Sequence, residues 1–194
     1  MRGIGVVSSP DTAVVAFRGL YILIVPFVVA GVSACSVIPE PLISKATGRE
    51  SYREPSEAMM PTLKKGDLVT GKIPGGTYAP KVGDVIAFLP PKSWGGSGGY
   101  MIKRVIGVPG NTVSCCDPQH RMVIDGKPVD EPYVTNERAS NFTFEPVVVP
   151  EGRIWVQGDN RDVSLDSRNH HRMGAEGTVP VSNVIGVIDV STAR

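Results

Sequence analysis

The chain has 194 residues, a formal net charge of +1 and three cysteines. This length suits one domain of ordinary size with short appendages, which can bury a core without disulfide staples. The near-neutral charge argues against a nucleic-acid-binding protein, and no cysteine or histidine pair has the spacing of a metal site. The 22 glycines and 17 prolines favour short strands joined by tight turns over a helical bundle.

The N-terminal part contains an apolar segment long enough to cross a membrane. Residues 19–38 carry no charge, and as a helix they would cover roughly 30 Å, the thickness of the hydrocarbon core. Arg2 and Arg18 precede this segment against a single acid, which predicts a cytoplasmic N-terminus and an outer location for the rest. The predicted parts are a cytoplasmic N-terminus, a transmembrane anchor, a juxtamembrane linker and an extracytoplasmic domain: residues 1–18, 19–38, 39–54 and 55–194.

Two alternatives to a retained anchor remain open. The segment could be a cleaved signal peptide, although its apolar run is longer than the usual hydrophobic region of such peptides. The residues from Val32 to Cys35 also resemble a bacterial lipobox, which would make Cys35 a lipidated N-terminus. All three interpretations put residues 40–194 on the outer face of the membrane.

Short apolar runs bounded by turn residues follow the linker and predict strands. They cover residues 67–73, 84–89, 100–108, 122–124, 127–129, 154–157 and 184–190. Two of these runs flank an Asp125-Gly126 turn and predict a hairpin. We therefore predict a mainly β fold: an antiparallel β-sheet core with a smaller inserted β subdomain at about 110–150, preceded by one N-terminal transmembrane helix.

Cys115 and Cys116 are neighbours in the chain. A disulfide between adjacent cysteines is disfavoured, because the usual Cα separation of a disulfide exceeds one trans peptide step. The sequence favours two reduced thiols that point to opposite faces of a strand. A vicinal disulfide remains the alternative.

Three blocks stand out, PSEAMMPTL at 55–63, YMIKRVIG at 100–107 and GDNRDVSLDSR at 158–168. In this order and at these spacings they resemble bacterial type I signal peptidases, which are membrane-anchored serine proteases with a Ser/Lys dyad. The resemblance covers roughly residues 50–190. It implies that the β-sheet core is a catalytic core.

The resemblance also assigns the reacting groups. The nucleophilic serine of the family stands just before the methionine of the first block, and here that place holds Ala58, which has no nucleophilic atom. Lys103 matches the general base. On an alternating strand it would share an apolar face with Met101 and Val105, and this desolvation would lower its pKa from about 10.4. Ser56 matches a residue that forms the oxyanion hole with the backbone N–H of Ala58, and in an extended segment these two residues would face the same way.

The third block supplies supporting residues. Ser164 matches a position whose hydroxyl helps to orient the lysine amine, and Asp166 and Arg168 match a pair that braces the site. The resemblance further implies that the adjacent turn is shaped by Asp159, Asn160, Arg161 and Asp162.

The resemblance implies removal of signal peptides from presecretory proteins with Ala-x-Ala-like cleavage sites. The reaction needs no cofactor, and it would take place at the lipid surface of the bacterial plasma membrane. A related possibility is a conjugation-type processing peptidase with a narrow substrate. As written, the chain should be inactive, either through deliberate inactivation or because it is a natural non-catalytic relative that binds signal peptides. The oligomeric state is left open.

Overall fold

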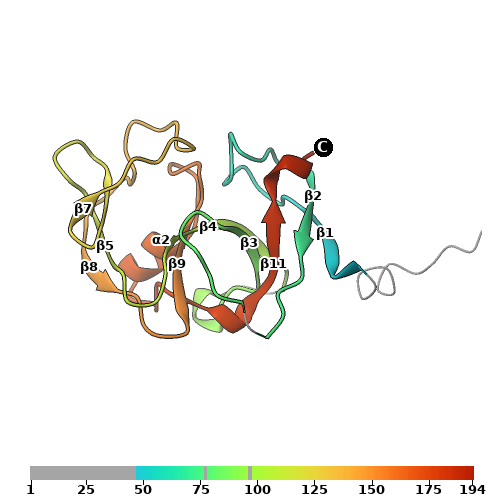
Figure 1. The fold of residues 1–194 in the computed structure, drawn as a ribbon. Helices are drawn as coiled ribbons and strands as arrows, with labels where there is room; N and C mark the ends of the chain where they lie inside the picture. Colours follow the sequence, from blue (N-terminus) through green and yellow to red (C-terminus); the bar gives the residue numbers. More distant parts are fainter. Residues whose placement is uncertain (1–46, 77, 96–97) are drawn as a thin grey trace, which may run out of the picture. The chain divides into compact units, whose positions relative to one another are not determined.

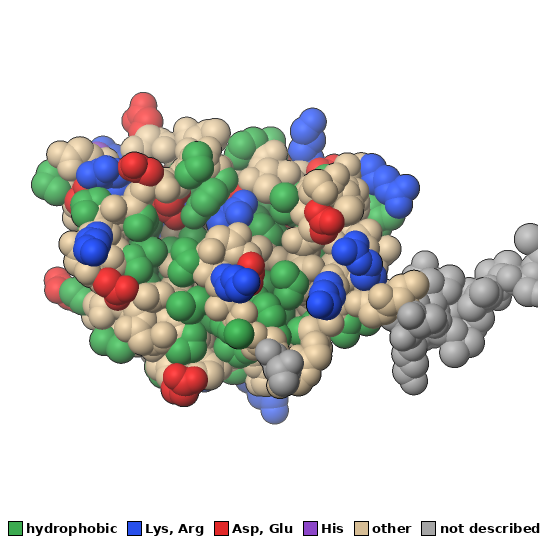
Figure 2. Space-filling view, in the orientation of Figure 1, with side chains coloured by type: hydrophobic (Ala, Val, Ile, Leu, Met, Phe, Trp, Pro, Cys, Tyr) green, Lys and Arg blue, Asp and Glu red, His purple; other side chains and the backbone are tan. Residues whose placement is uncertain are grey.

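The computed structural model describes residues 47–76, 78–95 and 98–194 (Figure 1). The predicted anchor at 19–38 and residues 39–46 of the predicted linker lie outside the described residues. No described helix has both the length and the apolar character needed to cross a membrane. Basic and acidic side chains are interspersed over the face shown in Figure 2 and form no single-sign patch there.

A seven-stranded antiparallel sheet forms the larger part of the described fold, in the order β1-β2-β11-β3-β4-β9-β10. Figure 1 shows β2, β11 and β3 side by side, with the sheet curving on towards β4 and β9. The strands are β1 Arg49–Arg53, β2 Leu68–Lys72, β3 Val85–Phe88, β4 Met101–Gly107, β9 Arg153–Gln157, β10 Val179–Pro180 and β11 Val184–Asp189. All four residues of β3 are buried, which accounts for its continuous apolar sequence.

A second antiparallel sheet lies inside the range in which an inserted subdomain is predicted. Its order is β7-β6-β5-β8, with β5 Thr112–Cys115, β6 Met122–Ile124, β7 Lys127–Pro128 and β8 Phe144–Val148. The predicted hairpin is confirmed as β6 and β7. Asp125 and Gly126 both have positive φ, at 51° and 75°, as a two-residue hairpin turn requires.

The predicted linker at 39–54 requires a correction, because Arg49–Arg53 form strand β1 and pair with β2. The sequence of this edge strand shows no apolar alternation, because Tyr52 is its only buried residue. The Tyr52 hydroxyl donates to the carbonyl of Ile185 at 2.7 Å. A Cβ on Gly186 would come within 2.6 Å of the Tyr52 ring, so the absent side chain leaves room for that ring.

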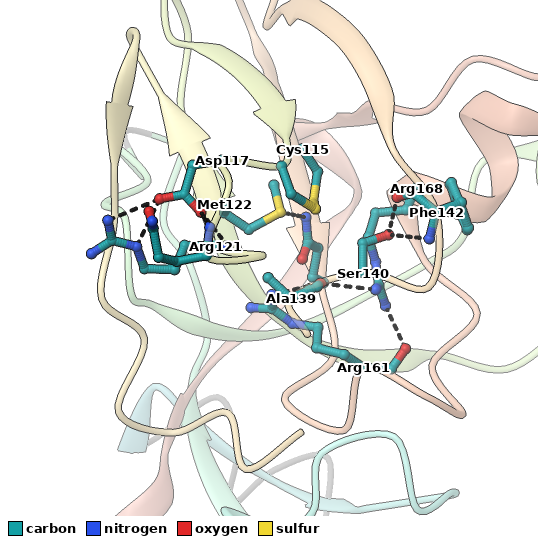
Figure 3. The surroundings of a disulfide bond; sticks show 12 residues. Cys115, Asp117, Arg121, Met122, Ala139, Ser140, Phe142, Arg161 and Arg168 are labelled. Carbon is teal, nitrogen blue, oxygen red and sulfur yellow. Dashed lines mark hydrogen bonds and ion pairs between the residues drawn. A yellow bond between two sulfur atoms is a disulfide. The ribbon is translucent and has the colours of Figure 1, made fainter. Parts of the chain in front are cut away.

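Cys115 and Cys116 are joined by a disulfide (Figure 3), whereas the sequence favoured two reduced thiols. The prediction relied on the Cα separation of one trans peptide step and on the alternating faces of a regular strand. That alternation ends at Cys115, which is the last residue of β5. Cys115 is buried in a cluster that also contains Met122 and Trp155.

Candidate active site

One cavity of about 490 Å³ brings the three sequence blocks together. Its lining includes Ser56 and Ala58 from the first block, Lys103 from β4, and Val163 and Leu165 from the third block. The residues that the resemblance assigned to the nucleophile position, the base and the oxyanion hole therefore share one cavity.

The segment that carries Ala58 is a turn, not the extended segment assumed in the sequence analysis. Met60 N–H donates to the carbonyl of Glu57 at 3.2 Å, and Leu63 N–H donates to that of Met59 at 2.9 Å. These short-range bonds replace the alternation of a strand. Ser56 and Ala58 are instead linked directly, because Ala58 N–H donates to Ser56 Oγ at 3.2 Å.

Ser56 is also tied to a carboxylate that the sequence analysis missed. The Ser56 hydroxyl and the Ser56 N–H donate to the same oxygen, Glu54 Oε1, at 2.9 and 3.0 Å. Glu54 is 1% exposed. Burial raises its pKa, while the bonds from Ser56 and the charge of Lys103 act in the opposite direction. Nothing in the local sequence distinguishes Glu54 from a surface acid, so only the fold reveals it.

Lys103 lies on β4, between β3 and β9, and is 2% exposed. Its amine donates to the carbonyl of Ile102 at 3.0 Å. Burial lowers the pKa of this amine, while Asp166, Glu54 and Asp159 act against that effect. An amine with a lowered pKa is more easily neutral, which is the state that a general base needs.

The third block begins directly after β9. Its backbone forms a hydrogen bond to the turn that contains Ala58. Asn160 N–H donates to the carbonyl of Ala58 at 2.9 Å. Gly158 N–H donates to Ser164 Oγ and to Asp166 Oδ2, both at 3.1 Å. A Cβ on Gly158 would lie within 3.0 Å of Ser164 and of the Ala58 carbonyl, so only glycine fits there.

The described contacts of Ser164 leave its assigned role untested. Its hydroxyl accepts from Gly158 N–H and is hydrogen-bonded to Asp166. The Lys103 amine donates to the carbonyl of Ile102. An orienting effect of Ser164 on the amine therefore stays a prediction.

Asp166 and Arg168 form a buried ion pair at the start of helix α2, Ser167–Arg172. The guanidinium donates to both carboxylate oxygens, at 3.0 and 2.8 Å. Burial by itself would raise the pKa of Asp166, but the charge and hydrogen bonds of Arg168 hold it below its ordinary value. Asp166 also caps the helix by accepting from Arg168 N–H at 3.1 Å.

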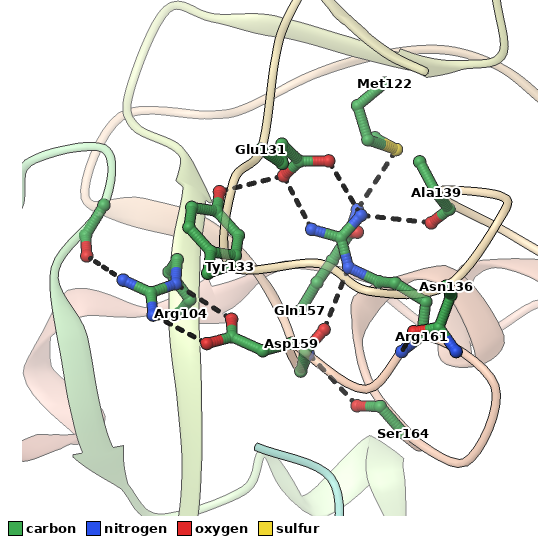
Figure 4. Close-up of polar contacts among 12 residues, drawn as sticks. Arg104, Met122, Glu131, Tyr133, Asn136, Ala139, Gln157, Asp159, Arg161 and Ser164 are labelled. Atoms are coloured by element: carbon green, nitrogen blue, oxygen red, sulfur yellow. Dashed lines mark hydrogen bonds and ion pairs between the residues drawn. The ribbon is translucent and has the colours of Figure 1, made fainter. Parts of the chain in front are cut away.

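A second buried ion pair joins β4 to the third block (Figure 4). Arg104 donates to both oxygens of Asp159, at 2.8 and 2.6 Å. Thr62, from the first block, donates to Asp159 at 2.5 Å. Asp159 was predicted to shape a turn, and in addition it joins all three blocks. Arg104 could have been suspected, because it directly follows Lys103 in the second block.

The neighbouring Arg161 ties the third block to the second sheet region. It makes a bidentate ion pair with Glu131 at 2.9 and 2.6 Å and donates to the carbonyl of Ala139 at 3.1 Å.

Within residues 47–76, 78–95 and 98–194, no group of three or more His, Cys, Asp or Glu side chains is arranged to hold a metal ion.

Comparisons with known proteins agree on one family. The family described as "Signal peptidase, peptidase S26" matches residues 23–192. The chain is 36% identical over 189 residues to a probable signal peptidase I of Mycobacterium leprae, covering 70% of this chain and 65% of that protein. It is 34% identical over 184 residues to signal peptidase I of Mycobacterium tuberculosis, covering 70% and 62%.

A solved structure of a signal peptidase I from Enterococcus faecalis is also similar. It has 30% sequence identity and a TM-score of 0.45, and the match covers 58% of this chain and 98% of the other. The chain spans 65% and 62% of the lengths of the two mycobacterial relatives.

Proposed function

The chain belongs to the signal peptidase family, peptidase S26, and we propose that its fold is that of a type I signal peptidase whose nucleophile is missing. The substrates would be presecretory proteins with small residues at the −3 and −1 positions of the cleavage site. The observation that carries this proposal is the cavity in which Ser56, Ala58 and the buried Lys103 meet.

The proposed chemistry uses a serine at position 58. Its hydroxyl attacks the scissile carbonyl, and the neutral amine of Lys103 takes the proton. The N–H of residue 58 and the hydroxyl of Ser56 stabilise the oxyanion. With Ala58 no atom can attack, and loss of a serine nucleophile costs on the order of 10⁶ in rate.

The proposed substrate enters as an extended segment and binds by strand addition. Val163 and Leu165 would form an apolar wall for the bound substrate, because both line the cavity and their side chains are exposed, at 57% and 50%. The predicted single-pass anchor at 19–38 would hold the site on the outer face of the bacterial plasma membrane, where the end of a signal peptide emerges.

A second candidate is a natural, non-catalytic, membrane-anchored relative that binds signal peptides. One observation favours it: the Ser56 hydroxyl donates to Glu54, and Ala58 N–H donates to Ser56. Both proposed oxyanion donors are therefore engaged within the chain itself.

Cleavage of a preprotein with Ala at −3 and −1 separates the two candidates. The full chain and its Ala58→Ser variant, called the serine variant below, are compared in detergent. We expect cleavage by the serine variant only. Adding Lys103→Met should abolish that activity, whereas adding Lys64→Met, at an exposed lysine outside the cavity, should not. A folded serine variant that fails to cleave both alone and with Glu54→Leu added, which removes the acceptor of the Ser56 hydroxyl, would refute the peptidase proposal and favour the binding protein.

A further inference from the structure

Glu54 is a buried carboxylate beside the proposed site, and the proposed chemistry gives it no role. It directly precedes the first block and is 1% exposed. Its backbone is fixed, because Glu54 N–H donates to the carbonyl of Asp67 and its own carbonyl accepts from Gly66 N–H, both at 2.9 Å. The carboxylate is thus presented to Ser56 by a fixed backbone.

The two proposed oxyanion donors, Ala58 N–H and the Ser56 hydroxyl, form a chain of hydrogen bonds that ends at this carboxylate, and this chain is called the series below. Ala58 N–H donates to Ser56 Oγ at 3.2 Å, and the Ser56 hydroxyl donates to Glu54 Oε1 at 2.9 Å. A hydroxyl and a backbone N–H each have a single proton to donate. Neither donor is therefore available to a substrate carbonyl while the series is intact.

Burial raises the pKa of Glu54, and in its ionised form this carboxylate is a strong competitor for the two protons. Hydrogen bonds to an ionised acceptor are stronger than those between neutral groups. The other oxygen, Glu54 Oε2, is buried and has no hydrogen-bond partner among the described residues. A buried polar atom without a partner is costly, so packing alone does not account for an acid at this position.

Glu54 also influences the charge of the proposed base. Its negative charge stabilises the ammonium form of Lys103, which opposes the lowering of the lysine pKa by burial. Burial has the largest effect on both groups, since it lowers the pKa of Lys103 and raises that of Glu54. The neighbours that also shift these pKa values are Asp166, Glu54, Asp159 and Arg168 for Lys103, and Ser56, Lys103 and Asp67 for Glu54. Removing the charge of Glu54 should therefore make the neutral amine easier to reach.

We propose that Glu54 is a positioning residue that withholds the Ser56 hydroxyl and the Ala58 N–H from a bound carbonyl. The inference rests on the proposed function, because it treats these two groups as oxyanion donors. On this proposal, two residues prevent activity at the site: Ala58, which lacks a nucleophile, and Glu54, which engages the oxyanion donors. Restoring a serine at position 58 supplies the nucleophile but leaves the donors engaged.

The test adds Glu54→Gln or Glu54→Leu to the serine variant and measures kcat, KM and the pH profile on the same preprotein. Glutamine keeps the shape and a weaker acceptor, and leucine removes the acceptor. We expect kcat to be lowest in the serine variant, higher with Glu54→Gln added, and highest with Glu54→Leu added. The total rise should be at least about tenfold, because one oxyanion donor is worth about 10²–10³ in kcat. Glu50→Gln, an exposed acid on β1, is the charge-matched control and should leave kcat unchanged.

A merely structural role predicts the opposite order. Loss of two hydrogen bonds to Ser56 would loosen the turn, so kcat would fall from Glu to Gln to Leu. An unchanged or falling kcat in variants that unfold at the same urea concentration as the serine variant would overturn the inference and leave the proposed function standing. Cleavage by none of the variants, the double variant with Glu54→Leu included, would overturn the proposed function and this inference with it.

A second readout uses the unaltered Ala58 chain and needs no cleavage. The amine of Lys103 is titrated by NMR in protein labelled at its lysines, with Glu54→Gln and Glu50→Gln compared. The titration midpoint of Lys103 should fall by at least about half a unit with Glu54→Gln, because an opposite charge near the amine has been removed. The same midpoint in both variants would show that Glu54 does not act on the base.

Discussion

Replacing Gly158 by alanine tests whether the third block holds the reaction centre by close backbone contact. The new Cβ would lie 2.6 Å from Ser164 Cβ and within 3.0 Å of the Ala58 carbonyl oxygen. Carbon atoms that are not bonded prefer about 3.5–4.0 Å, so these groups must separate by roughly 1 Å. A displacement of about 1 Å in a catalytic geometry costs on the order of 10² in rate. Such overpacking also destabilises the fold by about 1–3 kcal/mol.

The assay is preprotein cleavage by the serine variant with and without Gly158→Ala, beside urea unfolding of both proteins. Gly75→Ala is the matched control, because a Cβ there meets no atom within 4 Å. We expect the Gly75 variant to cleave like its parent and the Gly158 variant to lose most activity while still folded. Full activity in the Gly158 variant would show that the contact does not position the site.

Three further outcomes follow from the buried polar and charged side chains. Cleavage by the serine variant should rise with pH as Lys103 loses its proton, with an inflection below the 10.5 of an unperturbed lysine; a higher inflection in kcat against pH would contradict a desolvated base. Asp159→Ala should lower the free energy of unfolding in urea by about 3–5 kcal/mol, because Arg104 is left buried without its partner. As a control, Asp130→Ala, which removes an exposed ion pair with Arg121, should change this free energy little. Ser164→Ala in the serine variant should lower kcat about tenfold and leave KM unchanged, because it removes the hydroxyl that is predicted to orient the Lys103 amine, an effect the size of one hydrogen bond.

Much of the fold follows from local sequence patterns. The seven predicted strands match β2, β3, β4, β6, β7, β9 and β11 to within one residue, because burial on one or both faces is visible in the composition of a strand. Strands β5, β8 and β10 were not predicted. Strand β1 shows no such composition. It lies at the edge of the sheet, where pairing with β2 depends on backbone hydrogen bonds and on one buried side chain, Tyr52. A polar edge strand cannot be told from a linker without its partner.

The site shows the same division between what is local and what is not. The resemblance of the blocks to a known family assigned roles to Ala58 and Lys103, and the structure places both residues in one cavity. The partners of buried charges are set by the fold instead. Asp159 lies 55 residues from Arg104, and no local pattern pairs them. Glu54 was missed for a related reason, since a carboxylate looks the same in sequence whether it faces water or the protein interior.

The proposed loss of a nucleophile at position 58 leaves the structure of the turn in place. Ala58 is 4% exposed, and its N–H and carbonyl are bonded to Ser56 and Asn160. The atom that a serine would add is not among those that hold the turn, so Ala58→Ser should restore the hydroxyl without a backbone rearrangement. If that substitution alone gives full activity, one atom separates this chain from a working peptidase. If full activity also requires a change at Glu54, the chain is two substitutions from activity, and a natural non-catalytic relative becomes the better account of it.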